Sequence, residues 1–472
     1  MIIQKFGGTS MGTPEAINHS VIPIIKQAKI EGQSPIVVVS AMSGITNSLL
    51  KAADHGLNEN LEQANAAINE IRDRHRELIR KSIGDLHIME QAIIYVNAET
   101  ERLQRLAEGI SAVGEITPRV QDKIMAIGEK LSAYILNCIL NGQGHRSEYV
   151  DLEKIGTNLS LDNEDAWTQV ESAFRERLQR VPAGVTPICT GFFGHTRDGL
   201  IQTVGRGYSD FTASITGATM HADKIENWTD VNGVMTTNPQ LVSEARTIPS
   251  LSYHEVAELS QNGAKVLHPF CIEPAARAGI PIHVRNTFKP KNHGTMIESA
   301  PGADQLPELK SIAYKKGISV ITVETPRMLD THGYMEKISR IFAHHKVPID
   351  LISTSAVSVS ISVDQKPDRL EALLKDLREL GEVKAGNSYG IISIVGSQLN
   401  QYLGTFGKIF SELSAAGIAV RMISMGNQQM NLNLVVDDKD LETGIKLLHN
   451  LHINHTSHSS PPAAQTSAPK QP

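Results

Sequence analysis

The chain has 472 residues, of which 40% are hydrophobic and 20% charged, and its formal net charge is −6 at pH 7. This length predicts roughly two to four domains. The acidic balance argues against nonspecific nucleic-acid binding, because no basic excess is present to neutralise phosphates. No apolar run approaches the ~20 residues of a membrane span, and no signal-peptide pattern opens the sequence. Three widely spaced cysteines indicate a reducing compartment, so we expect a cytoplasmic protein without a cysteine metal site.

The first expected strand, residues 2–6, runs into a glycine turn. Lys5 lies near the end of this strand, and Gly7, Gly8 and Thr9 follow it before an expected helix. A double glycine after a strand lets backbone N–H groups point at a phosphate, and the lysine supplies a point charge. The spacing is not the Walker pattern. An ordinary turn explains the same residues, so both interpretations stay open here.

A second strand is expected at residues 35–40, a β-branched run typical of a buried parallel strand. The small-residue loop 40–47 then lies at a carboxyl strand end, where open α/β sheets bind ligands. Residues 59–109 are charged and helical in period, which predicts a helical insertion with a solvated face. The next helix contains Gly128 beside Glu129. A glycine inside a helix costs ~1 kcal/mol relative to alanine, which suggests close approach of another group, although a surface charge also explains Glu129.

The central motif follows an apolar strand pattern at residues 187–192. Two glycines flank Arg206, and Ser209 and Asp210 occupy the N-cap region of a helix expected over 211–220. A strand, a glycine turn and a helix N-terminus together favour an anion, because the unpaired N–H groups and the helix dipole both attract negative charge. The arginine adds a fork suited to a carboxylate or phosphate. The alternative is an ordinary turn with a solvated arginine.

A further strand begins at Lys224 and ends with Thr229 and Asp230 before an Asn-Gly turn. Asp230 is suited to accept a ribose hydroxyl, to hold a metal-bound water, or simply to cap the turn. Lys265 is a second lysine at a glycine turn. The alternation of strands and helices over residues 1–290 predicts a mostly parallel sheet covered on both faces.

The C-terminal part contains an internal repeat. Residues 291–311, rich in Lys, Pro and Gly, are expected to link two domains. The strand patterns at 317–323 and 390–395 each begin a βαββα unit with a further strand, which is typical of a split βαβ fold. Such modules expose sheet edges that pair, so we expect a small-ligand interface and a homo-oligomer. The low-complexity tail, residues 454–472, is expected to be disordered.

With these motifs in place, the chain resembles the aspartate kinases of the amino-acid kinase family that carry two C-terminal ACT domains. The resemblance lies in residues 5–10, 205–210, 228–231 and 263–269, in the family's order, and extends to about residue 452. It implies an α/β fold whose mostly parallel sheet is sandwiched by helices, plus two ferredoxin-like βαββαβ ACT domains. The implied domains are a catalytic domain at 1–290 with the 59–109 insertion, a linker at 291–311, ACT domains at 312–385 and 386–453, and the tail at 454–472.

The resemblance implies transfer of the γ-phosphoryl group of ATP to the side-chain carboxylate of aspartate, the first step of lysine, threonine and methionine biosynthesis. Mg²⁺ is expected to be held by ATP phosphates and water, so no metal-ligating residue is assigned. By the same resemblance, Lys5 and Asp210 are catalytic; Thr46, Glu129, Phe192, Arg206 and Ser209 bind aspartate; and Gly7, Gly8, Thr9, Thr229, Asp230 and Lys265 bind ATP.

The ACT domains of the resemblance imply feedback control by an amino acid, most often lysine, and a homodimer or homotetramer joined through these domains. The implied effector contacts are Met328, Gly333, Tyr334, Met335, Asp350, Thr354 and Ser355.

The sequence departs from the family pattern at several positions. Tyr208 replaces a usual Gly, Met235 a usual Tyr, and Ala356 a usual Glu, while Asn238 and Gln240 replace an Asp and an Arg. Two alternatives therefore stand beside an active aspartate kinase. One is a kinase for another amino acid such as glutamate, and the other is a catalytically silent amino-acid sensor.

Overall fold

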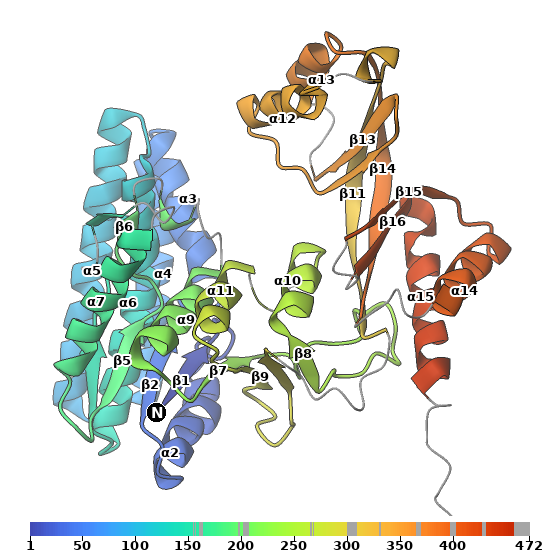
Figure 1. Cartoon of the computed structure of the whole chain (residues 1–472). Helices are drawn as coiled ribbons and strands as arrows, with labels where there is room; N and C mark the ends of the chain where they lie inside the picture. The colour runs from blue at the N-terminus through green and yellow to red at the C-terminus, as the bar shows by residue number, and fades with distance from the viewer. Residues whose placement is uncertain are drawn as a thin grey trace, which may run out of the picture. The chain divides into compact units, whose positions relative to one another are not determined.

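The computed structural model of this chain forms two compact units. It describes residues 1–153, 155, 157–159, 164–196, 199–201, 207–264, 267, 269–299, 309–329, 332–364, 370–396, 403–426 and 431–456. The first unit comprises residues 1–234, 247–260 and 265–301, and the second comprises 235–246, 261–264 and 302–472. Figure 1 shows the elements of both units. Within the described residues, no helix is both long enough and apolar enough to cross a membrane.

The first unit is built on an eight-stranded sheet. Neighbouring strands are parallel except for the antiparallel pair β9 and β10. The strands, in spatial order, are β3 (Ser147–Val150), β5 (Thr186–Thr190), β2 (Pro35–Val39), β1 (Ile2–Phe6), β7 (Lys224–Thr229), β9 (Ile282–Asn286), β10 (Thr295–Glu298) and β8 (Ser250–Ser252). A separate short pair joins β4 (Thr157–Leu159) to β6 (His195–Thr196). The mixed α/β class with a mostly parallel sheet is confirmed.

Helices cover this sheet because its central strands are buried and mostly apolar. β1, β2 and β5 are buried along their whole length, as strands of a parallel sheet covered on both faces must be. Helix α9 packs against β1, β2 and β7, and α6 packs against β2, β3 and β5 (Figure 1). The helices are α1 (Pro14–Ala16), the π-helix η1 (Ile17–Val21), α2 (Ile22–Ile30), α3 (Ile45–Leu57), α4 (Leu61–Ser82), α5 (Leu86–Val113), α6 (Pro118–Gly142), α7 (Glu164–Gln179), α9 (Tyr208–Met220), α10 (Tyr253–Gln261) and α11 (Pro269–Arg277).

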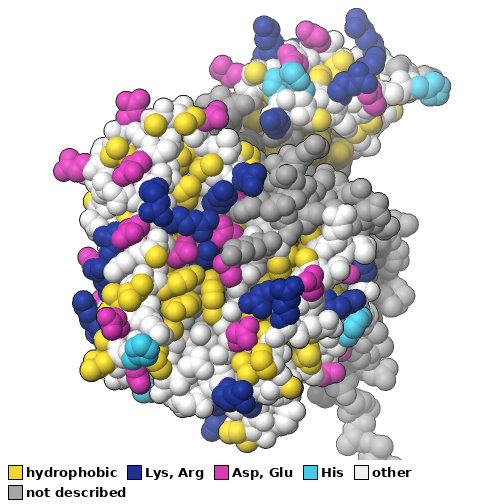
Figure 2. Space-filling model, turned by 90° about the vertical axis from the view of Figure 1, so that its left-hand side faces the viewer, with side chains coloured by type: hydrophobic (Ala, Val, Ile, Leu, Met, Phe, Trp, Pro, Cys, Tyr) yellow, Lys and Arg dark blue, Asp and Glu magenta, His cyan; other side chains and the backbone are white. Residues whose placement is uncertain are grey.

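Residues 59–109 are helical, as predicted, and form most of α4 and α5. Each helix begins at a side-chain cap: Asn60 accepts the Gln63 N–H at 3.1 Å, and Asp85 accepts the Ile88 N–H at 3.0 Å. These helices pack on each other and on α3 (Figure 1). On the face drawn in Figure 2, the described basic side chains are interspersed with acidic ones. This mixture is what a solvated helical surface requires.

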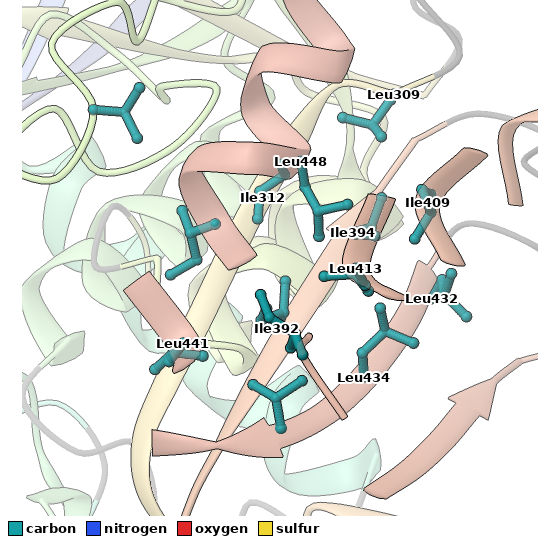
Figure 3. Close-up of a cluster of buried hydrophobic side chains, with 14 residues drawn as sticks. Leu309, Ile312, Ile392, Ile394, Ile409, Leu413, Leu432, Leu434, Leu441 and Leu448 are labelled. Atoms are coloured by element: carbon teal, nitrogen blue, oxygen red, sulfur yellow. The ribbon is translucent and has the colours of Figure 1, made fainter. Parts of the chain in front are cut away.

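The second unit contains one six-stranded antiparallel sheet in the order β12-β13-β11-β14-β16-β15. Its elements are β11 (Ser311–Glu324), the 3-10 helix η3 (Pro326–Met328), α12 (Tyr334–His344), β12 (Leu351–Thr354), β13 (Ser358–Val363), α13 (Glu371–Leu377), β14 (Glu382–Val395), α14 (Leu403–Ala415), β15 (Val420–Met425), β16 (Asn431–Asp437) and α15 (Asp438–Thr456). One core cluster joins β11, β14, β16, α14 and α15 (Figure 3). Strand β14 runs through the boundary expected between residues 385 and 386, so both repeats share it. The division into two ACT repeats at that boundary stays a prediction.

Part of the expected linker, residues 291–311, belongs to the first unit's sheet. Strand β10 lies inside it and pairs with β8 and β9. Residues 287–294 form the loop between β9 and β10, and Arg285 of β9 donates to the Pro290 carbonyl at 2.7 Å. Gly294 has φ 72°, and a Cβ there would lie 2.1 Å from the Val284 carbonyl oxygen. Part of this composition therefore marks a hairpin loop, while the boundary between the two units, at residues 301 and 302, also falls within the expected linker.

The other end of the chain also differs from the prediction. Helix α15 continues to Thr456, past the residue 454 at which the tail was expected to begin. The rest of that expected tail lies outside the described residues.

Gly128 provides a test of close packing against α6. A Cβ at this position would lie 2.7 Å from the Ala41 Cβ, so the 40–47 loop would have to move. Overpacking of this kind costs about 1–3 kcal/mol, more than the ~1 kcal/mol of helix propensity gained. We predict that Gly128→Ala lowers the melting temperature.

The matched control is Gly109→Ala in α5, where an added Cβ meets nothing within 4 Å. This variant should raise the melting temperature, because alanine only restricts the unfolded chain. Equal shifts of the same sign in the two variants would contradict the packing argument.

Candidate active site

The first unit has a cavity of about 390 Å³ at the carboxyl ends of its central strands. Ligands of open α/β sheets bind at this edge because loops and helix N-termini converge there. The residues lining the cavity are Lys5, Gly7, Gly8, Thr9, Ser40, Ala41, Met42, Ser43, Gly44, Thr46, Asn47, Glu129, Tyr208, Ser209, Asp210, Asn227 and Thr229. The structure thus gathers residues from five separate stretches of the sequence.

An ion pair between Lys5 and Asp210 lies in this cavity. The lysine comes from β1 and the aspartate from the first turn of α9, and their side chains are 8% and 16% exposed. Each charge of this sheltered pair stabilises the other. Either ion alone would lose its hydration without gaining a partner in its place. The pair therefore fixes a cationic group at the end of the sheet, beside the glycine turn.

The start of α9 differs from the sequence prediction. The helix begins at Tyr208, and Gly207 is its N-cap, without a side-chain hydrogen bond. The expectation that Ser209 and Asp210 cap a helix over 211–220 is therefore wrong. Both side chains are committed to the cavity instead, since Ser209 Oγ lies 2.8 Å from Ser40 Oγ while Asp210 pairs with the lysine.

The glycine turn after β1 is held by its neighbours. The Gly7 N–H donates to the Trp228 carbonyl at 3.0 Å, so it continues the sheet pairing and is not directed at a phosphate, contrary to expectation. A Cβ on Gly8 would lie 3.0 Å from the Ala41 carbonyl oxygen, which explains the second glycine. Thr9 donates to Asp230 at 3.1 Å. Asp230 is thus tied to the turn and does not line the cavity.

Glu129 is a buried carboxylate on the α6 side of the cavity. Glu129 is only 1% exposed, and its Oε1 accepts a hydrogen bond from the Ala41 N–H at 3.1 Å. Burial raises the pKa of Glu129 from 4.5 to about 7, and hydrogen bonds from Ala41 and Tyr208 together with the charge of Lys5 limit the rise. An ammonium group placed in the cavity would favour the ionised form.

The remaining predicted residues are not all brought to the cavity. Thr46 lines it, but Phe192 is fully buried and its ring packs edge-on against Tyr208, with centroids 5.1 Å apart. The phenylalanine therefore supports the cavity wall from behind. Arg206 and Lys265 lie outside the described residues.

Sequence reasoning missed Ser40 and Asn227. The serine bonds the Ser209 hydroxyl, and the asparagine is 4% exposed in the middle of β7. An amide in a strand whose other central residues are buried is a signal that could have been noticed. Which group it faces depends on strand register, which a single sequence does not reveal.

The predicted effector residues occupy two places in the second unit. Met328 ends η3, whose N-cap Thr325 donates its N–H to the Val357 carbonyl at 2.8 Å, next to the turn after Thr354. Gly333 is the N-cap of α12, which Tyr334 and Met335 begin. Ser355 lies in the turn after Thr354, 2.7 Å from Ser358.

Asp350 is the remaining predicted effector residue. It precedes the first residue of β12, at the opposite end of that strand from Thr354, and its carboxylate pairs with Lys315 at 2.6 Å. A four-residue strand is about 13 Å long, so an effector that contacts both ends of β12 would have to lie along it, and the assignment of these residues to one effector stays a prediction.

Comparison with known proteins identifies the family. The model of the amino acid kinase family matches residues 1–286, and an ACT domain model matches residues 392–451. The aspartokinase of Saccharomyces cerevisiae is 32% identical, covering 95% of this chain and 92% of its own. The lysine-sensitive aspartokinase 3 of Escherichia coli is 30% identical, covering 95% and 98%. The chain therefore belongs to the amino acid kinase family and, within it, to the aspartokinases, which are kinases.

Solved structures agree with this assignment. Aspartokinase III of E. coli in complex with aspartate and ADP superimposes with a TM-score of 0.79 at 27% identity, covering 95% of this chain and 99% of that one. The same enzyme in complex with lysine and aspartate gives a TM-score of 0.75 at 28% identity, with 96% and 99% covered.

The pKa of Glu129 predicts a pH-dependent stability. A carboxyl whose pKa is raised by folding binds its proton more tightly in the folded state, so stability is lost as pH rises from 4.5 through about 7. Glu129→Gln removes this ionisation. We predict that the variant is more stable than wild type at pH 8 and that its advantage shrinks toward pH 4.5, as measured by urea unfolding.

The exposed Glu62 of α4 supplies the control, and Glu62→Gln should show no such trend. A Glu129→Gln advantage that stays constant with pH would contradict the assigned pKa shift.

Proposed function

We propose that this chain transfers the γ-phosphoryl group of ATP to the side-chain carboxylate of L-aspartate, forming 4-phospho-L-aspartate and ADP. The observation that carries the proposal is the pairing of opposite charges in one cavity, with Lys5 and Asp210 on the sheet side and the buried Glu129 on the α6 side. The ADP and aspartate bound by the E. coli structure named above support the same two substrates. In the cell this reaction would begin lysine, threonine and methionine biosynthesis in the cytoplasm.

Each group has a role that its chemistry suits. An aspartate oxygen attacks the γ-phosphorus, and the bond to the ADP oxygen breaks and leaves its electron pair on ADP. No proton is transferred, so catalysis needs positioning and neutralisation of charge more than covalent chemistry. Lys5 would span the transferred phosphoryl group while Asp210 orients it. Glu129, with Thr46 and Ser209, would hold the α-amino end of aspartate.

The nucleotide would lie on the β7 side of the cavity. Thr229, the Gly7–Thr9 turn and Asp230 are the proposed contacts among the described residues, with Lys265 as a further one. Arg206 would grip the α-carboxylate of aspartate, since a guanidinium fork matches a carboxylate, and Phe192 supports that subsite through its packing on Tyr208.

Mg²⁺ is compatible with this cavity as a partner of ATP. Among the described residues no group of three or more His, Cys, Asp and Glu side chains is placed to hold a metal. Mg²⁺ commonly keeps several waters and binds through phosphates and one or two carboxylates, and Asp210 is the carboxylate beside Lys5 in the cavity. When bound, the ion would neutralise charge on the phosphates.

The second unit would make the activity responsive to an amino acid. An ACT domain model matches this part of the chain, and lysine is bound by the E. coli relative, so lysine is the first effector to test. The N-terminus of α12, whose cap Gly333 makes no side-chain hydrogen bond, offers N–H groups for a carboxylate. Assembly as a homodimer or homotetramer through the ACT domains would bring the Asp350 end of one chain near other contacts.

The activity is tested by trapping the acyl phosphate with hydroxylamine in the presence of ATP, Mg²⁺ and either aspartate or glutamate. We predict an aspartate-dependent hydroxamate that Lys5→Ala reduces by at least about a hundredfold, because a charge-stabilising group in the transition state is lost. Lys51→Ala, at an exposed position of α3, should retain wild-type activity. Product with glutamate but not aspartate would change the acceptor, and a folded protein without any product would favour the silent sensor.

A further inference from the structure

The contacts of β1 and β7 show which side chains share a face. Gln4 donates to Glu226 at 3.1 Å, and the rings of Phe6 and Trp228 stack with centroids 6.4 Å apart. These four residues therefore lie on one face of the sheet. Successive side chains of a strand point to opposite faces, so the residues between them point to the other face.

That other face carries Lys5 and Asn227 next to each other. The two residues are register partners of the parallel pair β1 and β7, and paired strands lie about 4.8 Å apart. Both line the cavity with Asp210. Ile225, two residues before the asparagine, is on the same face and meets α9 at Gly217, which places Asn227 on the side of the sheet that α9 covers.

The Asn227 side chain has an unfulfilled acceptor. The residue is 4% exposed, and Oδ1 is buried without a hydrogen-bond partner among the described residues. A buried acceptor left unpaired costs about 1–3 kcal/mol. An apolar β-branched residue would suit this strand position better. The amide is thus unfavourable for the fold alone, and such a group is expected where a site needs it.

The ammonium of Lys5 is a donor on the same face of the sheet as this acceptor. A lysine has three N–H donors and no acceptor. Asp210 takes one of them, and the phosphoryl group of the proposed reaction would take the second. We propose that Asn227 Oδ1 accepts the third, so that Asn227 is a positioning residue which aims the Lys5 ammonium at the phosphoryl group in transit.

This role rests on the proposed phosphoryl transfer but adds a residue to it. Asn227 takes no part in the bonds that form and break, because it acts only through the lysine. It should therefore affect kcat much more than the KM of either substrate. A purely structural asparagine would instead lower stability when replaced.

The test compares Asn227→Val with Asn227→Thr in the full-length protein. Valine and threonine have the same shape and both suit a strand, but only threonine retains an oxygen acceptor. Asn227→Val should lower kcat for aspartyl hydroxamate about tenfold to a hundredfold, the effect of one hydrogen bond to a charged group. Its KM values should stay within about twofold of wild type, and its melting temperature should equal or exceed wild type. Asn227→Thr should recover most of the lost kcat.

Thr219→Val is the matched control. Thr219 of α9 is 2% exposed, and its Oγ1 is also buried without a partner among the described residues, but it does not line the cavity. This variant should leave kcat unchanged. The proposal is overturned if Asn227→Val keeps wild-type kcat, if the valine and threonine variants lose kcat equally, or if the loss accompanies a lower melting temperature. If the wild-type protein makes no product, the proposed function itself is overturned. If the wild type is active but the Asn227 variants do not behave as predicted, only the role of Asn227 is overturned.

Discussion

One ion pair, between Lys5 and Asp210, is the constraint on which the first unit depends. It joins the first strand of the sheet to the first turn of α9, two elements that are about 200 residues apart in sequence. Removing either partner would leave the other charge sheltered from water and uncompensated, which is costly in a protein interior. The turn after β1 contains Gly7 and the N-cap of α9 is Gly207, so neither adds a side chain beside this pair.

Glu129 provides a carboxyl group on the α6 side of the cavity. The Lys5 side of the cavity is suited to phosphates, and the Glu129 side is suited to an ammonium group. Charge alone therefore favours ATP on one side of the cavity and the amino group of aspartate on the other. Because burial raises the pKa of Glu129, its charge costs energy in the empty protein and is repaid when an ammonium binds. The buried Glu129 therefore lowers the stability of the empty protein, and binding of the substrate's ammonium group relieves this cost. Functional sites commonly carry such locally unfavourable groups.

Much of this arrangement could be predicted from the sequence. The buried strands, the glycine turn after Lys5, the helical stretch at 59–109 and the family were all predicted from local pattern and motif order. Predictions from local composition were less reliable where the same residues are compatible with two structures. The first residues of the expected linker form β10 and its loop, although the unit boundary lies further along the same linker, and Ser209 resembles a cap although its hydroxyl lines the cavity.

Other features were beyond a single sequence because they depend on which strands are neighbours. Asn227 meets Lys5 only through the register of β1 and β7, and these strands are about 220 residues apart. Asp350 was expected among the effector contacts with Thr354, and the structure places the two at opposite ends of β12. A family resemblance predicts which residue is functional. The contacts of that residue depend on the fold of the backbone.

The central claim is that the cavity makes an acyl phosphate on the aspartate side chain. The most direct measurement mixes the protein with ATP, Mg²⁺ and aspartate, adds borohydride, and looks for homoserine, the reduction product of 4-phospho-L-aspartate. The account predicts homoserine in proportion to the ADP released. Release of ADP without homoserine, or no ADP from a folded protein, would contradict it.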